Sequence, residues 1–208
     1  SDGGAHGKVV ALKAHRDLNL WYRTGLPYDE IHPEDPNNVG VIARSETDGQ
    51  ENMKAYKQIP DWKTHYPVAA YVSDLNDENG NPGWYLPAIK EVQAMVGWID
   101  GEVLSPDGEA GQEPSEAMKE KRKAINQLIV DNGGNEFYFY GYDVSFIIDQ
   151  TNAWEADYFN RIYTSTETDY QVHPMVFKFY LRNGWWETMH VYGDLAGSYG
   201  EVRPFLAF

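Results

Sequence analysis

Residues 83–96 constrain the fold most, because they contain an extended segment that turns directly into a helix. Trp84 and Tyr85 favour a β-strand, and Leu86 is held extended by the proline that follows it. Pro87 suits the first turn of a helix, where its missing N–H group has no partner to lose. Beyond it, helical spacing separates an apolar face (Ile89, Val92, Met95, Val96) from residues that face away (Lys90, Gln93). We therefore predict a strand–helix unit that packs on a core.

Three further segments have helical patterns. Residues 45–52 contain short polar side chains that cap a short helix running toward Tyr56. Residues 66–75 begin beside a proline and carry apolar side chains on one face. Residues 115–131 follow another proline and end at a Gly-Gly pair. In this last helix we expect the charged run 119–123 to be solvated and the buried face to consist of Met118, Ile125, Leu128 and Ile129.

Elsewhere the pattern indicates strands. Residues 8–12 and 201–208 form the expected first and last strands, and from residue 137 onward a period of two predicts strands near 137–139, 144–148 and 175–181. Asn183-Gly184 lies between two aromatic-rich runs, which is typical of a tight hairpin. With that turn, one face carries Phe177, Phe179, Leu181, Trp186, Thr188 and His190. The other carries Lys178, Tyr180, Arg182, Trp185 and Glu187, with Lys178 and Glu187 on a diagonal.

Length and charge limit the class of protein. The 208 residues suffice for one domain with a substantial core, which we expect to span residues 1–208. The net charge of −15 repels phosphate backbones and anionic membranes, so we expect no nucleic-acid partner. No cysteine is present, which excludes disulfides, thiolate metal sites and cysteine nucleophiles. No apolar run approaches ~18 residues, so we expect no membrane insertion. The chain opens on a polar segment, and we expect any signal sequence to have been removed.

Candidates for chemistry are few. None of the six histidines lies in a His-x-x-x-His or Glu-x-x-His arrangement, so we expect neither a metal site nor a cofactor. Glu91 and Glu167 could be paired carboxylates for acid–base catalysis, or buried anchors for backbone N–H groups or for Arg203. We favour the anchor. The hydroxyl groups of Ser165 and Thr166 are expected to fix a strand end rather than to act as nucleophiles.

Four motifs occur in a fixed order along the chain: HGKVVAL at 6–12, GWYLPAIKEV at 83–92, IYTSTE at 162–167 and VRPFLAF at 202–208. Together they resemble bacterial surface domains related to the Fibrobacter succinogenes major paralogous domain, within the C-type-lectin-like superfamily. The resemblance covers nearly the whole chain. It implies an α+β C-type-lectin-like fold with a twisted, mostly antiparallel sheet, two or three flanking helices and neighbouring termini. Formylglycine-generating enzymes share this fold but depend on cysteines, which this chain lacks.

The resemblance also implies a function. We expect a non-enzymatic binding module on a bacterial surface or secreted, which recognises a carbohydrate or a protein, for instance as part of an adhesin. A structural domain of a larger envelope protein and a carboxylate-dependent glycoside hydrolase remain alternatives. In lectin-like domains the stretch before the closing strand commonly forms the ligand-binding face, and aromatic side chains supply large contact areas there. The candidate ligand-binding residues are Tyr170, His173, Tyr180, Arg182, Trp185, Glu187, Tyr192 and Tyr199.

Calcium is not expected to take part. Residues 76–83 carry oxygen ligands in the style of a calcium loop but lack the regular alternation of an EF-hand, so a plain polar turn is favoured. Neither Glu-Pro-Asn nor Trp-Asn-Asp, through which many animal C-type lectins hold calcium, occurs in the chain. Adding a chelator should therefore leave the melting temperature unchanged in a thermal scan. A fall of several degrees would contradict this.

Overall fold

The computed structural model describes residues 7–15, 42–79, 83–101, 114–137, 161–167, 174–179, 186–190 and 201–207. Helices and strands alternate irregularly along these segments. In chain order they are β1 (Lys8–Val10), α1 (Gly49–Tyr56), α2 (Trp62–His65), α3 (Pro67–Asn79), β2 (Trp84–Tyr85), α4 (Ile89–Asp100), α5 (Glu116–Asp131), β3 (Arg161–Glu167), β4 (Pro174–Phe179), β5 (Trp186–His190) and β6 (Phe205–Ala207).

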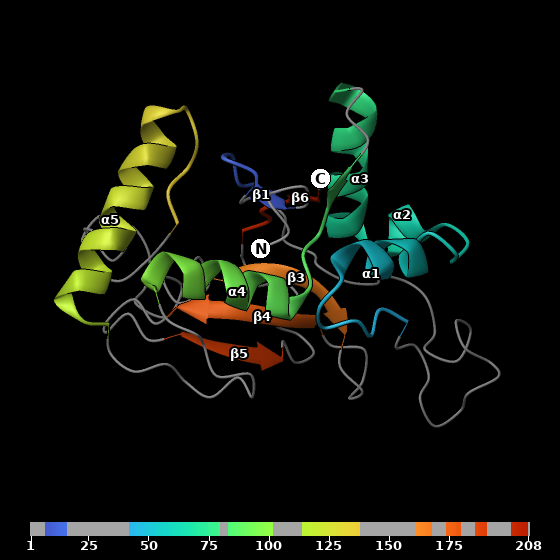
Figure 1. The fold of residues 1–208 in the computed structure, drawn as a ribbon. Helices are drawn as coiled ribbons and strands as arrows, with labels where there is room; N and C mark the ends of the chain where they lie inside the picture. The colour runs from blue at the N-terminus through green and yellow to red at the C-terminus, as the bar shows by residue number, and fades with distance from the viewer. Residues whose placement is uncertain are drawn as a thin grey trace, which may run out of the picture.

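The described strands form two small sheets of three strands each, in the orders β1-β6-β2 and β3-β4-β5. Every strand pair within these sheets is antiparallel. Figure 1 shows α4 lying along the β3-β4-β5 sheet, with α5 at one end of α4 and the β1–β6 pair on its other side. This mixture of helices with antiparallel sheet is consistent with the predicted α+β class. No described helix is long and apolar enough to cross a bilayer.

The prediction that the first and last strands lie side by side is confirmed. Lys8 is paired with Ala207 and Val10 with Phe205, so β6 lies between β1 and β2. Just before β6, the buried guanidinium group of Arg203 donates hydrogen bonds to the carbonyl oxygens of Leu12 at 3.0 Å and Asn135 at 2.8 Å. The C-terminal strand is therefore fixed to two segments that are distant in sequence.

The helix starts follow the expected capping chemistry. The carboxylate of Asp48 accepts the backbone N–H of Glu51 at 3.0 Å, and the hydroxyl of Ser115 accepts that of Met118 at 3.3 Å. Both contacts satisfy N–H groups that a first helical turn leaves without partners. However, five helices are described, so the prediction of two or three is too low. Of the two shortest helices, α1 (8 residues) is the short helix predicted to run toward Tyr56, whereas α2 (4 residues) has no counterpart in the prediction.

Helix α4 departs from the prediction in two respects. It begins at Ile89 and not at Pro87, because Ala88 is extended and forms the N-cap. Pro87 instead contributes its carbonyl oxygen, which accepts the N–H of Ser165 at 2.7 Å. The pattern predicts that Gln93 faces away, yet it is buried. The reason is that α4 contacts β3, β4 and α5, so that more of its circumference is covered than a simple two-sided helix would allow.

The buried face of helix α5 matches the prediction only in part: Ile129 is buried and Ile125 packs against the core, as predicted. Arg122, within the charged run, is buried, whereas Leu128 is 59% exposed. The buried stripe runs through Arg122, Asn126 and Ile129, and this rotation turns Leu128 to solvent. Arg122 is held by Asp100 at the end of α4 through two parallel hydrogen bonds of 2.7 Å each. This fork pairs a guanidinium group with a carboxylate in its best geometry.

The pairing of β4 with β5 corrects the predicted hairpin register. Phe179 lies opposite Trp186, and Lys178 lies directly opposite Glu187 rather than on a diagonal. The observed register is shifted by two residues from the one that an Asn183-Gly184 turn would impose. An even shift keeps the same residues on the same face, so the predicted grouping of Phe177 with Thr188 survives. The turn itself, residues 180–185, lies outside the described residues.

Two buried clusters form the core. One gathers residues of α1, α3 and β2, and the other gathers residues of α4 with Ile129, Ile162 and Phe177. Val10 and Met95 pack against both clusters, which joins them. Phe137 is buried in the second cluster but is not in a strand, contrary to prediction. The strands predicted near 139 and 144–148 fall outside the described residues.

The ion pair between Arg122 and Asp100 gives a prediction about stability. Replacing Arg122 by Leu leaves the buried Asp100 carboxylate without its two guanidinium hydrogen bonds, which should cost about 3–5 kcal/mol of unfolding free energy in urea titrations. The double variant Arg122→Leu/Asp100→Leu should recover most of that loss, because an apolar pair of similar size removes the uncompensated charge. Lys123→Leu is the matched control on an exposed neighbouring position and should change stability by less than about 0.5 kcal/mol. A single variant as stable as this control would contradict the proposed role.

Candidate functional site

The described surface contains a hollow between β1 and α4 with a volume of about 740 Å³. One wall is β1, through Lys8, Val9 and Val10. The opposite wall is a single stripe of α4, and Phe205 of β6 also lines the space. A volume of this size lies in the range typical of small-ligand sites. The hollow is therefore the candidate functional site.

Helical periodicity explains which α4 side chains reach the hollow. Residues three and four apart share a face of a helix, and the lining residues Lys90, Ala94 and Trp98 follow this spacing. The core takes the other side of the helix through Val92, Val96 and Ile99. As a result the Trp98 side chain is 75% exposed, an unusual position for an indole.

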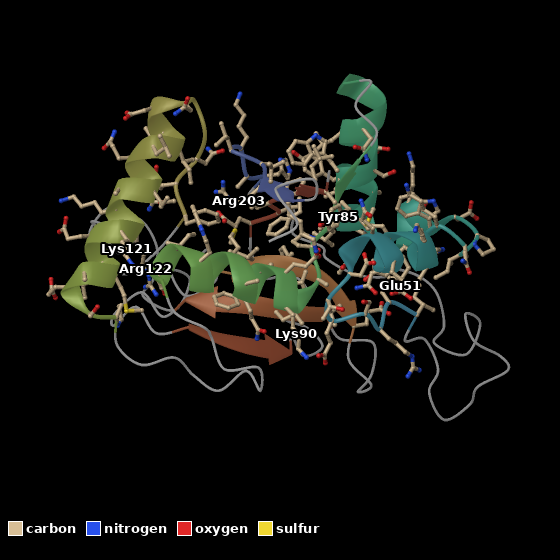
Figure 2. The ribbon with its side chains drawn as sticks, viewed as in Figure 1. Glu51, Tyr85, Lys90, Lys121, Arg122 and Arg203 are labelled. Atoms are coloured by element: carbon tan, nitrogen blue, oxygen red, sulfur yellow. The ribbon has the colours of Figure 1, made fainter. Side chains whose placement is uncertain are left out.

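At the N-terminal end of α4 the carboxylate of Glu91 forms the buried edge of the site. Its Oε2 atom accepts the backbone N–H groups of Ala88 at 2.7 Å and Gly49 at 3.0 Å. Its Oε1 atom accepts the phenol of Tyr85 at 2.8 Å and is paired with the ammonium group of Lys8. The Glu91 side chain is only 4% exposed, so these donors replace the water that the charge has lost. Tyr85 and Lys90 are labelled beside this end of α4 in Figure 2.

The Tyr85 phenol responds to this environment. Burial raises its pKa well above the ordinary value, and the neighbouring Glu91 carboxylate raises it further through charge repulsion and by accepting its hydrogen bond. Both effects favour the neutral phenol. Tyr85 is therefore a hydrogen-bond donor to Glu91 and not a proton donor to a ligand at neutral pH.

A second buried network confirms the anchoring roles predicted for the motif at 162–167. The Thr166 hydroxyl accepts the N–H of Ile89 at 3.0 Å and donates to the carbonyl of Ser45 at 2.9 Å. The Ser165 hydroxyl accepts a hydrogen bond from the amide of Asn52 at 3.0 Å. These contacts tie β3 to the starts of α1 and α4.

Glu167 has the same kind of role. Its Oε2 atom accepts the N–H groups of Ile42 at 2.9 Å and Ala43 at 3.2 Å. Both glutamates thus bind backbone N–H groups, as predicted. The alternative that either one anchors Arg203 is wrong, because Arg203 is paired with Glu201, to which its Nε donates at 3.1 Å.

The predicted ligand-binding residues cannot be placed together. Only Glu187 lies in a described segment, in β5 opposite Lys178. The remaining seven fall outside the described residues: Tyr170, His173, Tyr180, Arg182, Trp185, Tyr192 and Tyr199. Their grouping as a binding face stays a prediction.

Sequence reasoning missed the hollow itself. Its walls come from β1 and α4, which are about eighty residues apart in sequence. No local sequence pattern predicts that these two elements lie side by side. One signal was available: Trp98 lies off the stripe of Val92, Val96 and Ile99, so helical periodicity places a large aromatic on the open side. Among the described residues, no three His, Asp or Glu side chains are grouped so that they could hold a metal ion.

Comparisons of the chain with family models, with curated proteins and with solved structures find no match. The family resemblance drawn from the four sequence motifs therefore stays a prediction.

The raised pKa of Tyr85 predicts a dependence of stability on alkaline pH. In the unfolded chain the phenol ionises near pH ~10, whereas in the fold it holds its proton to higher pH. Its contribution to stability is therefore complete below pH ~10 and is lost as the pH rises above that value, by at most about 1.4 kcal/mol per pH unit for one proton. Urea unfolding between pH 8 and 11 (about the ordinary tyrosine range) should show a shallower decline for Tyr85→Phe. An unchanged slope in that variant would contradict the prediction.

Proposed function

We propose that this chain is a non-enzymatic binding module with a C-type-lectin-like fold, secreted or displayed on a bacterial cell surface. Its ligand is a carbohydrate or a protein, as expected for a component of an adhesin. The four ordered motifs support the fold and the location. The geometry of the hollow supports the binding role.

The observation that carries the proposal is the exposure of Trp98. An indole that is 75% exposed at the edge of a hollow offers a flat apolar face for contact with a partner. Such a face stacks well on a sugar ring or on a peptide side chain. Val9, across the hollow on β1, is 41% exposed and extends the apolar surface. Aromatic side chains of this kind dominate the energetics of recognition surfaces.

The state of the carboxylates supports binding over catalysis. Glu91 is the one carboxylate among the described lining residues of the hollow, and it already accepts two backbone N–H groups, the Tyr85 phenol and the Lys8 ammonium group. A glycoside hydrolase needs two carboxyl groups facing each other across the bond to be cleaved. A carboxylate that already accepts this many hydrogen bonds is suited to holding the scaffold together and not to transferring protons.

A glycan array and a host-protein array test the proposal. The wild-type chain should bind at least one ligand, and Trp98→Ala should weaken that binding by about tenfold or more, which corresponds to ~1.4 kcal/mol. Leu128→Ala is the matched control, because Leu128 is also exposed but lies on α5 away from the hollow. Alanine variants of Tyr180, Arg182 and Trp185 on the same array test the predicted hairpin face.

Two outcomes would contradict the proposal. The first is the absence of any ligand on either array. The second is a ligand whose binding falls equally for Trp98→Ala and Leu128→Ala, since a loss common to both reports a general change of the protein and not of the site.

A further inference from the structure

The two ends of the hollow differ in chemistry. At one end lie Lys8 and Lys90, and Lys90 belongs to the first turn of α4. At the other end lies Trp98, eight residues further along the helix and therefore about 12 Å away along its axis. Between them α4 lines the hollow with Glu91, Ala94 and Met95. The hollow thus carries two ion-paired lysines at one end and is apolar toward the other.

The two lysines at the first end are the groups that an anion would meet. Lys90 is paired with Glu46, but both side chains are partly exposed, at 39% and 49%. An exposed pair of this kind contributes little to stability, so the Lys90 ammonium group can turn to a ligand at small cost.

Long-range charge does not cancel this preference. The chain carries a net charge of −15, which disfavours anions at a distance. At physiological ionic strength, however, charges are screened beyond about 8 Å. A head group within the hollow is therefore governed mainly by the charges nearest to it, which are Lys8 and Lys90 with their ion-pair partners Glu91 and Glu46. Lys8 stays paired with the buried Glu91, and its side chain is still 46% exposed.

The apolar part is suited to a hydrocarbon chain. Ala94 and Trp98 are exposed on α4, and Val9 is exposed on the facing strand. A chain laid along α4 would cover these side chains and remove their apolar surface from water. The length of the stripe from Lys90 to Trp98, about 12 Å, fits an extended alkyl chain of medium length.

We propose that the hollow binds a linear amphiphile with an anionic head group, of the class of medium-chain alkyl carboxylates. The carboxylate lies beside Lys90 and Lys8, and the alkyl chain runs along Ala94 and Met95 to Trp98. This goes beyond the proposed function, because the ligand is a small molecule and its binding does not require that the chain recognise a carbohydrate or a protein.

Isothermal titration calorimetry with decanoate, decanol and decylammonium, each below its micelle concentration, tests the proposal on the full chain. Decanoate should bind saturably with one site, more tightly than decanol by about tenfold, and decylammonium should bind most weakly. Lys90→Gln should bring the affinity for decanoate close to that for decanol. Lys123→Gln, an exposed lysine on α5, is its control and should leave the difference intact.

A second pair of variants locates the site. Ala94→Phe places a large side chain in the hollow at an exposed helical position, and it should abolish binding of decanoate and decanol alike. Ala124→Phe makes the same change at an exposed position of α5 and should leave binding intact. Circular dichroism melts of both variants establish that they are folded.

Three results would overturn the proposal: no saturable binding of decanoate, equal affinity for all three probes, or wild-type binding by folded Ala94→Phe. None of these bears on the glycan and protein arrays, so the proposed function stands or falls separately. Loss of array binding with decanoate binding intact would likewise leave this inference in place.

Discussion

The buried carboxylate of Glu91 is the contact on which the described structure depends most. A charge removed from water costs several kcal/mol unless donors replace the lost solvation. Here the donors come from four elements or their starts: Lys8 on β1, Gly49 at the start of α1, Tyr85 on β2, and Ala88 at the start of α4. Each element is therefore held at a definite position relative to the others. The carboxylate thus links segments that are far apart in sequence.

Arg203 does the same for the C-terminal segment. Its guanidinium group donates to the carbonyls of Ala11, Leu12 and Asn135, and lies 4.0 Å from the centre of the Phe137 ring. Arginine suits this task because it offers five donors in a rigid plane and also stacks on aromatic faces. Arg203 thus contacts Phe137 of the second apolar cluster, whereas Glu91 accepts the phenol of Tyr85 from the first. Two oppositely charged, buried side chains thus order a fold whose sheets are only three strands wide.

Local features of this fold could be predicted from sequence because their causes are local. Asp48 and Ser115 cap the helices that follow them, and residues 84–85 form a strand before α4. The predictions that are wrong concern side chains whose partners are distant in sequence. Arg122 lies in a run of charges, and its burial requires Asp100, twenty-two residues earlier. Periodicity assigns faces by polarity, so it placed Leu128 inside and Arg122 outside, and both assignments are wrong.

The hollow also depends on a contact between segments that are distant in sequence, so its chemistry depends on the scaffold. Neither β1 nor α4 alone carries a site, and the ion pair of Lys8 with Glu91 spans the two walls. One member of that pair is buried and neutralised, while the other keeps a partly exposed ammonium group at the mouth. The interaction that links strand and helix therefore also leaves a partly exposed ammonium group beside the hollow. Other lining side chains, Val9 and Trp98 among them, are exposed and take no part in the core.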